Sequence, residues 1–126
     1  MADKIVLQSL VDRTFQIDPK IRYVAFADVN GLVLVGGMRE GVRSYDSDED
    51  QRLRTVQRSL SGYMVSDWER IYGEYKFNVM GFQKLTLIQF PFDELMLNIS
   101  TEPDIHPIEM TRKIRDLISK PISTQI

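Results

Sequence analysis

The feature that most constrains the fold is a pair of apolar, β-prone segments that flank the dipeptide Asn30-Gly31. The segment 23–29 is rich in aromatic and small residues, and the segment 32–35 contains only valine and leucine. An Asn-Gly pair in this setting predicts a β-hairpin with a two-residue type I′ turn, because both residues tolerate the positive φ angles that this turn requires. Neither segment alternates with charged residues. We therefore expect a hairpin over 21–37 that is covered on both faces and lies at the centre of a sheet.

The composition is that of one globular domain, which we expect to span 1–126. Hydrophobic residues make up 43% and charged residues 27% of the chain, and the net charge is −2 with acids and bases interspersed. This balance argues against a protein that binds nucleic acid by neutralising phosphates. The sequence has no cysteine, no apparent signal peptide and no apolar segment of the ~20 residues that a membrane helix needs. We expect a cytoplasmic protein without disulfides or membrane insertion.

Two helices are predicted in the first half of the chain. An amphipathic pattern favours a helix over 3–15 with Asp3 as its N-cap. A much longer helix is predicted from Ser47, its N-cap candidate, to Ile71, and Gly62 within it suggests a kink or a close approach of another backbone. Apolar residues recur along this second helix at steps of three and four: Leu53, Val56, Leu60, Tyr63, Met64, Trp68 and Ile71.

The second half predicts three strands and a final helix. The strands are expected over 74–80, 84–90 and 95–101, with turns at 81–83 and, with Pro91, at 91–94. The short links make these strands an antiparallel meander. The last helix should begin near 102–104 and end near 119, before a loose tail over 119–126. The predicted class is α+β, with one five-stranded antiparallel sheet, helices on both faces, and the order helix-strand-strand-long helix-strand-strand-strand-helix.

The second helix is too long for the sheet alone. About 24 residues span ~36 Å, whereas five strands span ~24 Å. Either the helix breaks near Gly62, or part of it packs against a second copy of the chain. Its aromatic and methionine residues fit an interface and an ordinary core equally well. The strand over 74–80 would also be an exposed pairing edge. The candidate dimer interface consists of Leu60, Tyr63, Met64, Trp68, Tyr75, Phe77 and Val79.

This order of elements, together with the hairpin sequence at 28–33, resembles the Roadblock/LC7 family and, more loosely, longin and profilin-like folds. The resemblance covers about residues 3–119. It implies a non-enzymatic protein that dimerises through the long helix (53–71) and the strand over 74–80, giving one continuous sheet across two subunits. It further implies a scaffold or regulator of a small GTPase or another signalling partner. The hairpin at 21–31 and the loop at 36–41 are also similar to those of small archaeal proteins of unknown function.

The segment after the hairpin supports an alternative function. Backbone N–H groups and guanidinium groups there are suited to an anion, although the spacing of a phosphate-binding loop is absent and a solvated connection is the simpler interpretation. The alternative is a PAS- or GAF-like sensor of a small molecule or anion, which holds its ligand between sheet and helix. The residues of this candidate loop are Gly36, Gly37, Arg39, Gly41 and Arg43.

No catalytic residue, metal site or cofactor is predicted. The one histidine, His106, is expected to be a surface or capping residue, because a single histidine makes a poor metal site. The acids over 46–50 lack the pattern of a calcium loop. No motif for a nucleophile with its base is present, so we expect a protein that is not an enzyme.

Overall fold

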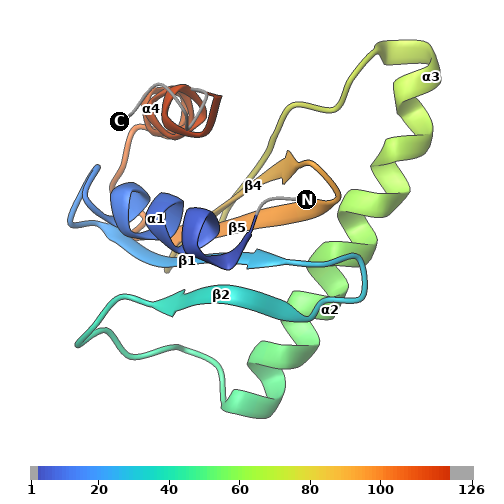
Figure 1. The fold of residues 1–126 in the computed structure, drawn as a ribbon. Coiled ribbons are helices and arrows are strands. Elements are labelled where there is room, and N and C mark those ends of the chain that lie inside the picture. The colour runs from blue at the N-terminus through green and yellow to red at the C-terminus, as the bar shows by residue number, and fades with distance from the viewer. Residues whose placement is uncertain (1–2, 120–126) are drawn as a thin grey trace.

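The structure is a computed structural model that describes residues 3–119, apart from the side chains of Tyr63 and Ser66. Its elements are α1 (Lys4–Phe15), β1 (Ile21–Ala27), β2 (Val33–Met38), α2 (Asp48–Val65), the 3-10 turn η1 (Ser66–Trp68), α3 (Glu69–Tyr72), β3 (Asn78–Gly81), β4 (Thr86–Phe92), β5 (Leu95–Thr101) and α4 (Pro107–Ser119). The strands form one antiparallel five-stranded sheet in the order β2-β1-β5-β4-β3. Helices α1 and α4 lie on one face, and α2 crosses the other (Figure 1). The predicted α+β class and element order are confirmed.

The hydrophobic core lies between the sheet and the pair α1 and α4. Alternate residues of the three inner strands point into it, as the period-two geometry of a strand requires. Its fully buried members include Phe26, Phe90 and Leu97 from the sheet and Leu7 and Ile114 from the helices. Both predicted N-caps on the first two helices are confirmed. The Asp3 carboxylate accepts from the Val6 N–H at 3.0 Å, and the Ser47 hydroxyl accepts from the Asp50 N–H at 3.1 Å.

The face of the sheet beneath α2 is polar instead. Buried Gln89 and Asn98 come from β4 and β5, and the Gln89 amide donates to the Asn98 side-chain oxygen at 3.0 Å. Helix α2 places Thr55 and Ser59 against this face, and both are also buried. The sheet therefore carries an apolar layer on one side and a hydrogen-bonded polar layer on the other.

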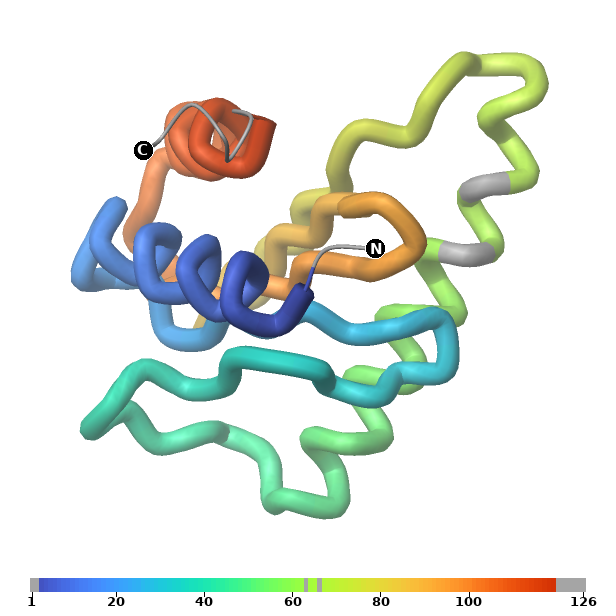
Figure 2. The backbone as a smooth tube through the Cα atoms, viewed as in Figure 1, coloured from blue at the N-terminus to red at the C-terminus, as the bar shows by residue number. Residues whose placement is uncertain are grey.

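The hairpin differs from its prediction in two ways. Of the Asn30-Gly31 pair only Gly31 has a positive φ, 84°, so the type I′ turn is wrong. The Asp28 carboxylate accepts from the backbone N–H groups of Asn30 (2.9 Å) and Leu32 (3.0 Å), which stabilises a wider loop over 28–32. The hairpin is also not central. β5 pairs with both β1 and β4, and β2 is a partly exposed edge strand. The loop lies beside α2 (Figure 2), where the Ser59 hydroxyl donates to the Asp28 carbonyl at 3.2 Å.

The long helix is continuous past Gly62 and changes to a 3-10 turn only at Ser66. Gly62 is buried, and a Cβ at this position would collide with the tip of the Met96 side chain. The glycine therefore marks a close approach to the sheet, made by a side chain and not by another backbone.

Three boundaries in the second half are also corrected. β3 begins at Asn78, not at 74, and α4 begins at Pro107, not near 102–104. Pro91 belongs to β4, and the turn is made by Asp93 and Glu94, with Asp93 at φ 54°. β3 pairs with β4 only from residue 86 to residue 89, so β4 has a free side at Pro91 and tolerates a residue without an N–H. The predicted loose tail lies, beyond Ser119, outside the described residues.

Candidate functional site

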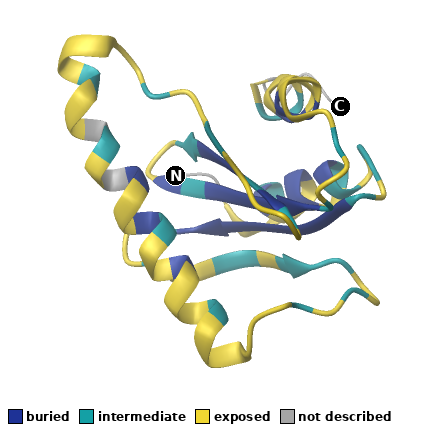
Figure 3. Cartoon of the chain, turned by 180° about the vertical axis from the view of Figure 1, so that it is seen from behind, coloured by how far each residue is buried: buried dark blue, intermediate teal, exposed yellow. Residues whose placement is uncertain are grey.

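The apolar stripe of α2 faces away from the sheet. Leu60 is 55% exposed and Met64 71% exposed, whereas Thr55 and Ser59, on the opposite side of the helix, are 6% and 3% exposed. Figure 3 shows this division along the helix, with the buried residues toward the sheet. Leu53 and Val56 are also exposed on the outer side. Val56, at the edge of the stripe, lies against Gly31 of the hairpin loop. A stripe with helical spacing that stays this exposed is typical of a protein–protein interface.

The exposed apolar surface continues beyond α2. Trp68, Ile71 and Tyr72 in η1 and α3 are all exposed. The nearby edge strand β3 is hydrogen-bonded to β4 on one side only, and its Met80 is 47% exposed. The described residues therefore leave both a helix face and a strand edge uncovered.

A cavity of about 500 Å³ lies between α2, the sheet and the loop that precedes α2. Four cationic residues line it, Arg22, Arg54, Arg58 and Lys84, with Asp46 as the one acidic residue. Apolar lining comes from strand and loop residues such as Met80, Leu85 and Leu87. The cavity is thus positively charged on one part of its wall and apolar on another.

A polar network forms the deep end of this cavity. The Tyr75 hydroxyl donates to Gln89 Oε1 at 3.1 Å, and Gln89 Nε2 donates to the Arg58 carbonyl at 3.0 Å. The Arg58 guanidinium donates to the carbonyls of Ile88 and Ile99 at 3.3 and 3.4 Å. Burial lowers the pKa of Arg58 to about 10, so the group remains charged at neutral pH.

The comparisons with known proteins show the fold. No protein-family model and no curated protein sequence matches the chain. A Roadblock/LC7 domain from Streptomyces avermitilis superposes with a TM-score of 0.67, over 89% of this chain and 91% of that chain, at 10% identity. MglB from Myxococcus xanthus superposes with a TM-score of 0.68, over 99% of this chain and 100% of that chain, at 13% identity. An MglB with a tetrameric arrangement superposes with a TM-score of 0.66, over 94% of this chain and 93% of that chain, at 10% identity.

The chain has a Roadblock/LC7 fold. The resemblance predicted from element order is confirmed at the level of the fold, despite the low sequence identities. The similarity to archaeal proteins stays a prediction.

Within this Roadblock/LC7 fold the described residues of the predicted interface fall in three places. Leu60, Met64 and Trp68 are exposed on the long helix and its extension. Tyr75 points beneath α2, where its hydroxyl meets Gln89. Phe77 and Val79 point to the other face: Val79 packs against the hydrophobic core, and the Phe77 ring lies 6.0 Å from Arg115 Cζ of α4. The side chain of Tyr63, also predicted, lies outside the described part of the structure.

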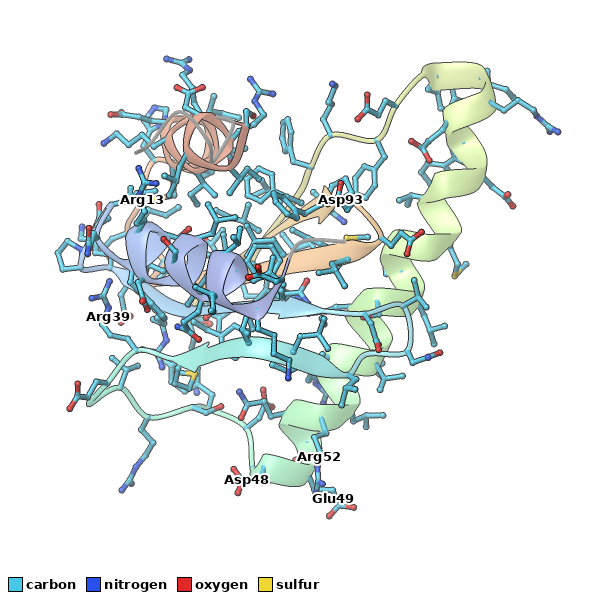
Figure 4. The ribbon with its side chains drawn as sticks, in the orientation of Figure 1. Arg13, Arg39, Asp48, Glu49, Arg52 and Asp93 are labelled. Atoms are coloured by element: carbon cyan, nitrogen blue, oxygen red, sulfur yellow. The ribbon has the colours of Figure 1, made fainter. Side chains whose placement is uncertain are left out.

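The five residues of the candidate anion loop do not share one pocket. Gly36 and Gly37 are paired residues of β2. The Arg39 guanidinium donates to the carbonyls of Ile21 (2.7 Å), Phe15 (2.8 Å) and Asp18 (2.8 Å). Figure 4 shows Arg39 near the loop that joins α1 to β1. Gly41 and Arg43 are exposed in the loop that follows. The arrangement gives Arg39 a structural role and brings no second guanidinium to it.

Residues 3–119 hold no cluster of three or more potential metal ligands. His106 caps α4, since its Nδ1 accepts from the Glu109 N–H at 3.3 Å. None of the described helices combines the length and apolar character needed to cross a membrane.

Sequence reasoning missed the cavity and Arg58, the cation at its polar end. The available signal was the run Thr55, Ser59 and Gly62, at steps of four and three on the side of α2 opposite the apolar stripe. Small residues in that pattern allow a helix to lie close to a sheet, and Arg58 belongs to the same side of the helix.

Proposed function

We propose that the protein is a non-enzymatic regulatory scaffold that works as a homodimer. The observation that carries the proposal is the apolar stripe of α2, which its own chain leaves exposed. An apolar helix face of this kind is stabilised when a partner covers it, and two-fold pairing of identical surfaces is the commonest way to do so. The tetrameric arrangement of an MglB with the same fold supports self-association.

The proposed dimer surface centres on Leu60 and Met64 and extends to the edge strand β3. Pairing of two β3 edges would continue the sheet across the two subunits, and the exposed Met80 lies on that strand. Tyr75 and Val79 contribute less in this arrangement, because their side chains already have partners in their own chain. We place the protein in the cytoplasm, with a small GTPase as the class of partner that the Roadblock/LC7 resemblance implies.

Light scattering across a hundredfold concentration range tests the dimer. We expect a mass of twice the 14.6 kDa of one chain, independent of concentration. The double substitution Leu60→Glu with Met64→Glu should give a monomer, because it puts carboxylates at the centre of the apolar surface. The matched control is Ile5→Glu with Ile108→Glu, which changes two exposed apolar residues on α1 and α4, at 83% and 57% exposure. A monomeric native protein, or a stripe variant with the native mass, contradicts the proposal.

Binding of a purified small GTPase, loaded with GDP or with a GTP analogue, tests the regulatory role. We expect the native protein to bind one nucleotide state more tightly than the other, since a regulator must distinguish them. Equal binding of both states, or none, contradicts a role in GTPase regulation and leaves the dimer untouched.

A further inference from the structure

The cavity beneath α2 has more positive charge than its own walls neutralise. Arg22 is paired with Glu102, with 2.9 Å between Nη1 and Oε2. Arg54, Arg58 and Lys84 take part in none of the ion pairs formed by the described residues. Arg54 donates to the neutral amide of Gln57 at 2.9 Å, and Lys84 lies 5.7 Å from the centre of the Tyr45 ring. Three unpaired cations thus line the cavity, against the single lining carboxylate of Asp46.

Arg58 is the most informative of the three. Its guanidinium reaches two backbone carbonyls at 3.3 and 3.4 Å, which are long distances for hydrogen bonds from a charged group. Burying a cation without a counter-charge costs free energy. The same burial lowers the pKa of Arg58 to about 10, because it disfavours the charged form. An anion in the cavity would offset that cost and supply shorter, charge-assisted hydrogen bonds.

The other residues that line the cavity indicate the size and polarity of the rest of the ligand. Met80 and Leu87 offer apolar surface, and the Tyr45 ring lies at the loop side of the cavity, with Arg22 Cζ 4.4 Å from its centre. The volume of about 500 Å³ falls in the range of small-molecule sites. Arg54 and Arg58 stand four residues apart on one helix, so their guanidinium groups can reach one anionic group together.

We propose that this cavity binds a small organic anion, whose phosphate or carboxylate pairs with Arg54 and Arg58 and whose planar or apolar body packs against Met80 and Leu87. The site lies on the inner side of α2, away from Leu60 and Met64 at the dimer centre, and it shares Met80 of β3 with the extended dimer surface. It also differs from the loop of Gly36 to Arg43, whose Arg39 is engaged by backbone carbonyls.

The test is a titration of the full ¹⁵N-labelled chain followed by NMR. Phenyl phosphate is the first probe because it joins a planar ring to a phosphate. Benzoate replaces the phosphate by a carboxylate, and benzamide keeps the ring without the charge. We expect saturable shifts at the amides of 54–58 and 87–89 with phenyl phosphate or benzoate, and binding of benzamide at least about tenfold weaker, the scale of one charge-assisted hydrogen bond. The tighter of the two anions identifies the ligand's acidic group.

Variants locate the site. Arg54→Gln and Lys84→Gln should each weaken binding of the tighter anion by about tenfold. Arg52→Gln is the matched control, an exposed arginine two residues away on the same helix that does not line the cavity (Figure 4). These variants keep the test decisive even where Arg58→Gln fails to fold.

Three results would each overturn the inference: no saturable shift at these amides with either anion, benzamide binding as tightly as the anions, or equal affinities for the Arg54 and Arg52 variants. The mass measurement on the same samples separates the two proposals. A monomer that binds the anion supports this inference and contradicts the dimer, and a dimer that binds no anion does the reverse.

Discussion

Arg39 holds three segments together with one side chain. Its guanidinium donates to carbonyls at the end of α1, in the following loop and at the start of β1, and it lies 5.0 Å from the centre of the Phe15 ring. The planar, multiply donating group of arginine suits this role better than any other side chain. Sequence position alone does not show what a guanidinium contacts, so the sequence places Arg39 with the other residues of the candidate anion loop.

Arg39→Ala should therefore destabilise the fold. We expect the free energy of unfolding in urea to fall by about 2 kcal/mol, because three partly buried carbonyls lose a charged donor. Arg43→Ala, in the exposed loop, should change it by less than about 0.5 kcal/mol. Equal stabilities of the two variants would show that Arg39 contributes no more to the stability of the fold than a solvated loop residue does.

Gly36→Ala tests the backbone of β2. Gly36 has φ 99°, and a Cβ there would lie 2.7 Å from Ala25 Cα of the paired strand. Strain and collision together should cost about 2 kcal/mol or more. Gly81→Ala is the control, since a Cβ at Gly81 meets nothing within 4 Å. Thermal unfolding of both variants checks the difference, and a stable Gly36 variant would show that β2 can shift away from β1.

At the scale of elements, α2 has its apolar and polar sides reversed relative to an ordinary covering helix. Periodicity correctly predicts the stripe, but the pattern fits a core and an interface equally well. The sheet decides which side of α2 faces inward, because its α2-facing side carries Gln89, Asn98 and Ser100, which are all buried. A polar surface of this kind is satisfied by hydrogen bonds and not by leucine, so the helix turns Thr55 and Ser59 inward.

Gln89→Leu probes this polar layer. The substitution keeps the approximate volume but removes the donor to the Asn98 side-chain oxygen and to the Arg58 carbonyl, and one acceptor of the Tyr75 hydroxyl. We expect a loss of about 2 kcal/mol in the free energy of unfolding. Gln83→Leu, in the exposed loop between β3 and β4, serves as the control. An unchanged urea midpoint for Gln89→Leu would mean that the polar layer contributes little to stability.

At the scale of the whole molecule, the polar layer makes the stability of the fold depend on pH. Tyr23 and Tyr75 lie in the polar layer, and burial raises the pKa of both hydroxyls, while the nearby Arg58 opposes the rise. The unfolded chain ionises its tyrosines near pH of about 10. The folded state keeps these two protonated longer, so the stability they support is present below that pH and falls as pH rises above it.

Alkaline unfolding checks this behaviour. The urea midpoint of the native protein should decline above about pH 10. Tyr23→Phe should make that decline shallower, because one group with a raised pKa is removed. Tyr72→Phe, which changes an exposed tyrosine, should leave the decline as it is in the native protein. Parallel declines in all three proteins would assign the pH dependence to other groups.

The sequence by itself determined the elements. The helix caps at Asp3 and Ser47, the stripe on the long helix, the strand over 95–101 and the α+β class all depend on sterics and periodicity within a few residues. Even here the Asn-Gly pair misled, because the Asp28 carboxylate two positions earlier changed the turn.

Only the tertiary structure decided which surfaces are covered. The position of β2 at an edge, the outward direction of the stripe and the cavity around Arg58 arise from contacts between segments far apart in the chain. Arg58 reaches the carbonyls of Ile88 and Ile99, and Ser59 reaches that of Asp28. Local pattern cannot specify such contacts, since a side chain's partner depends on how sheet and helix meet and not on its neighbours in sequence.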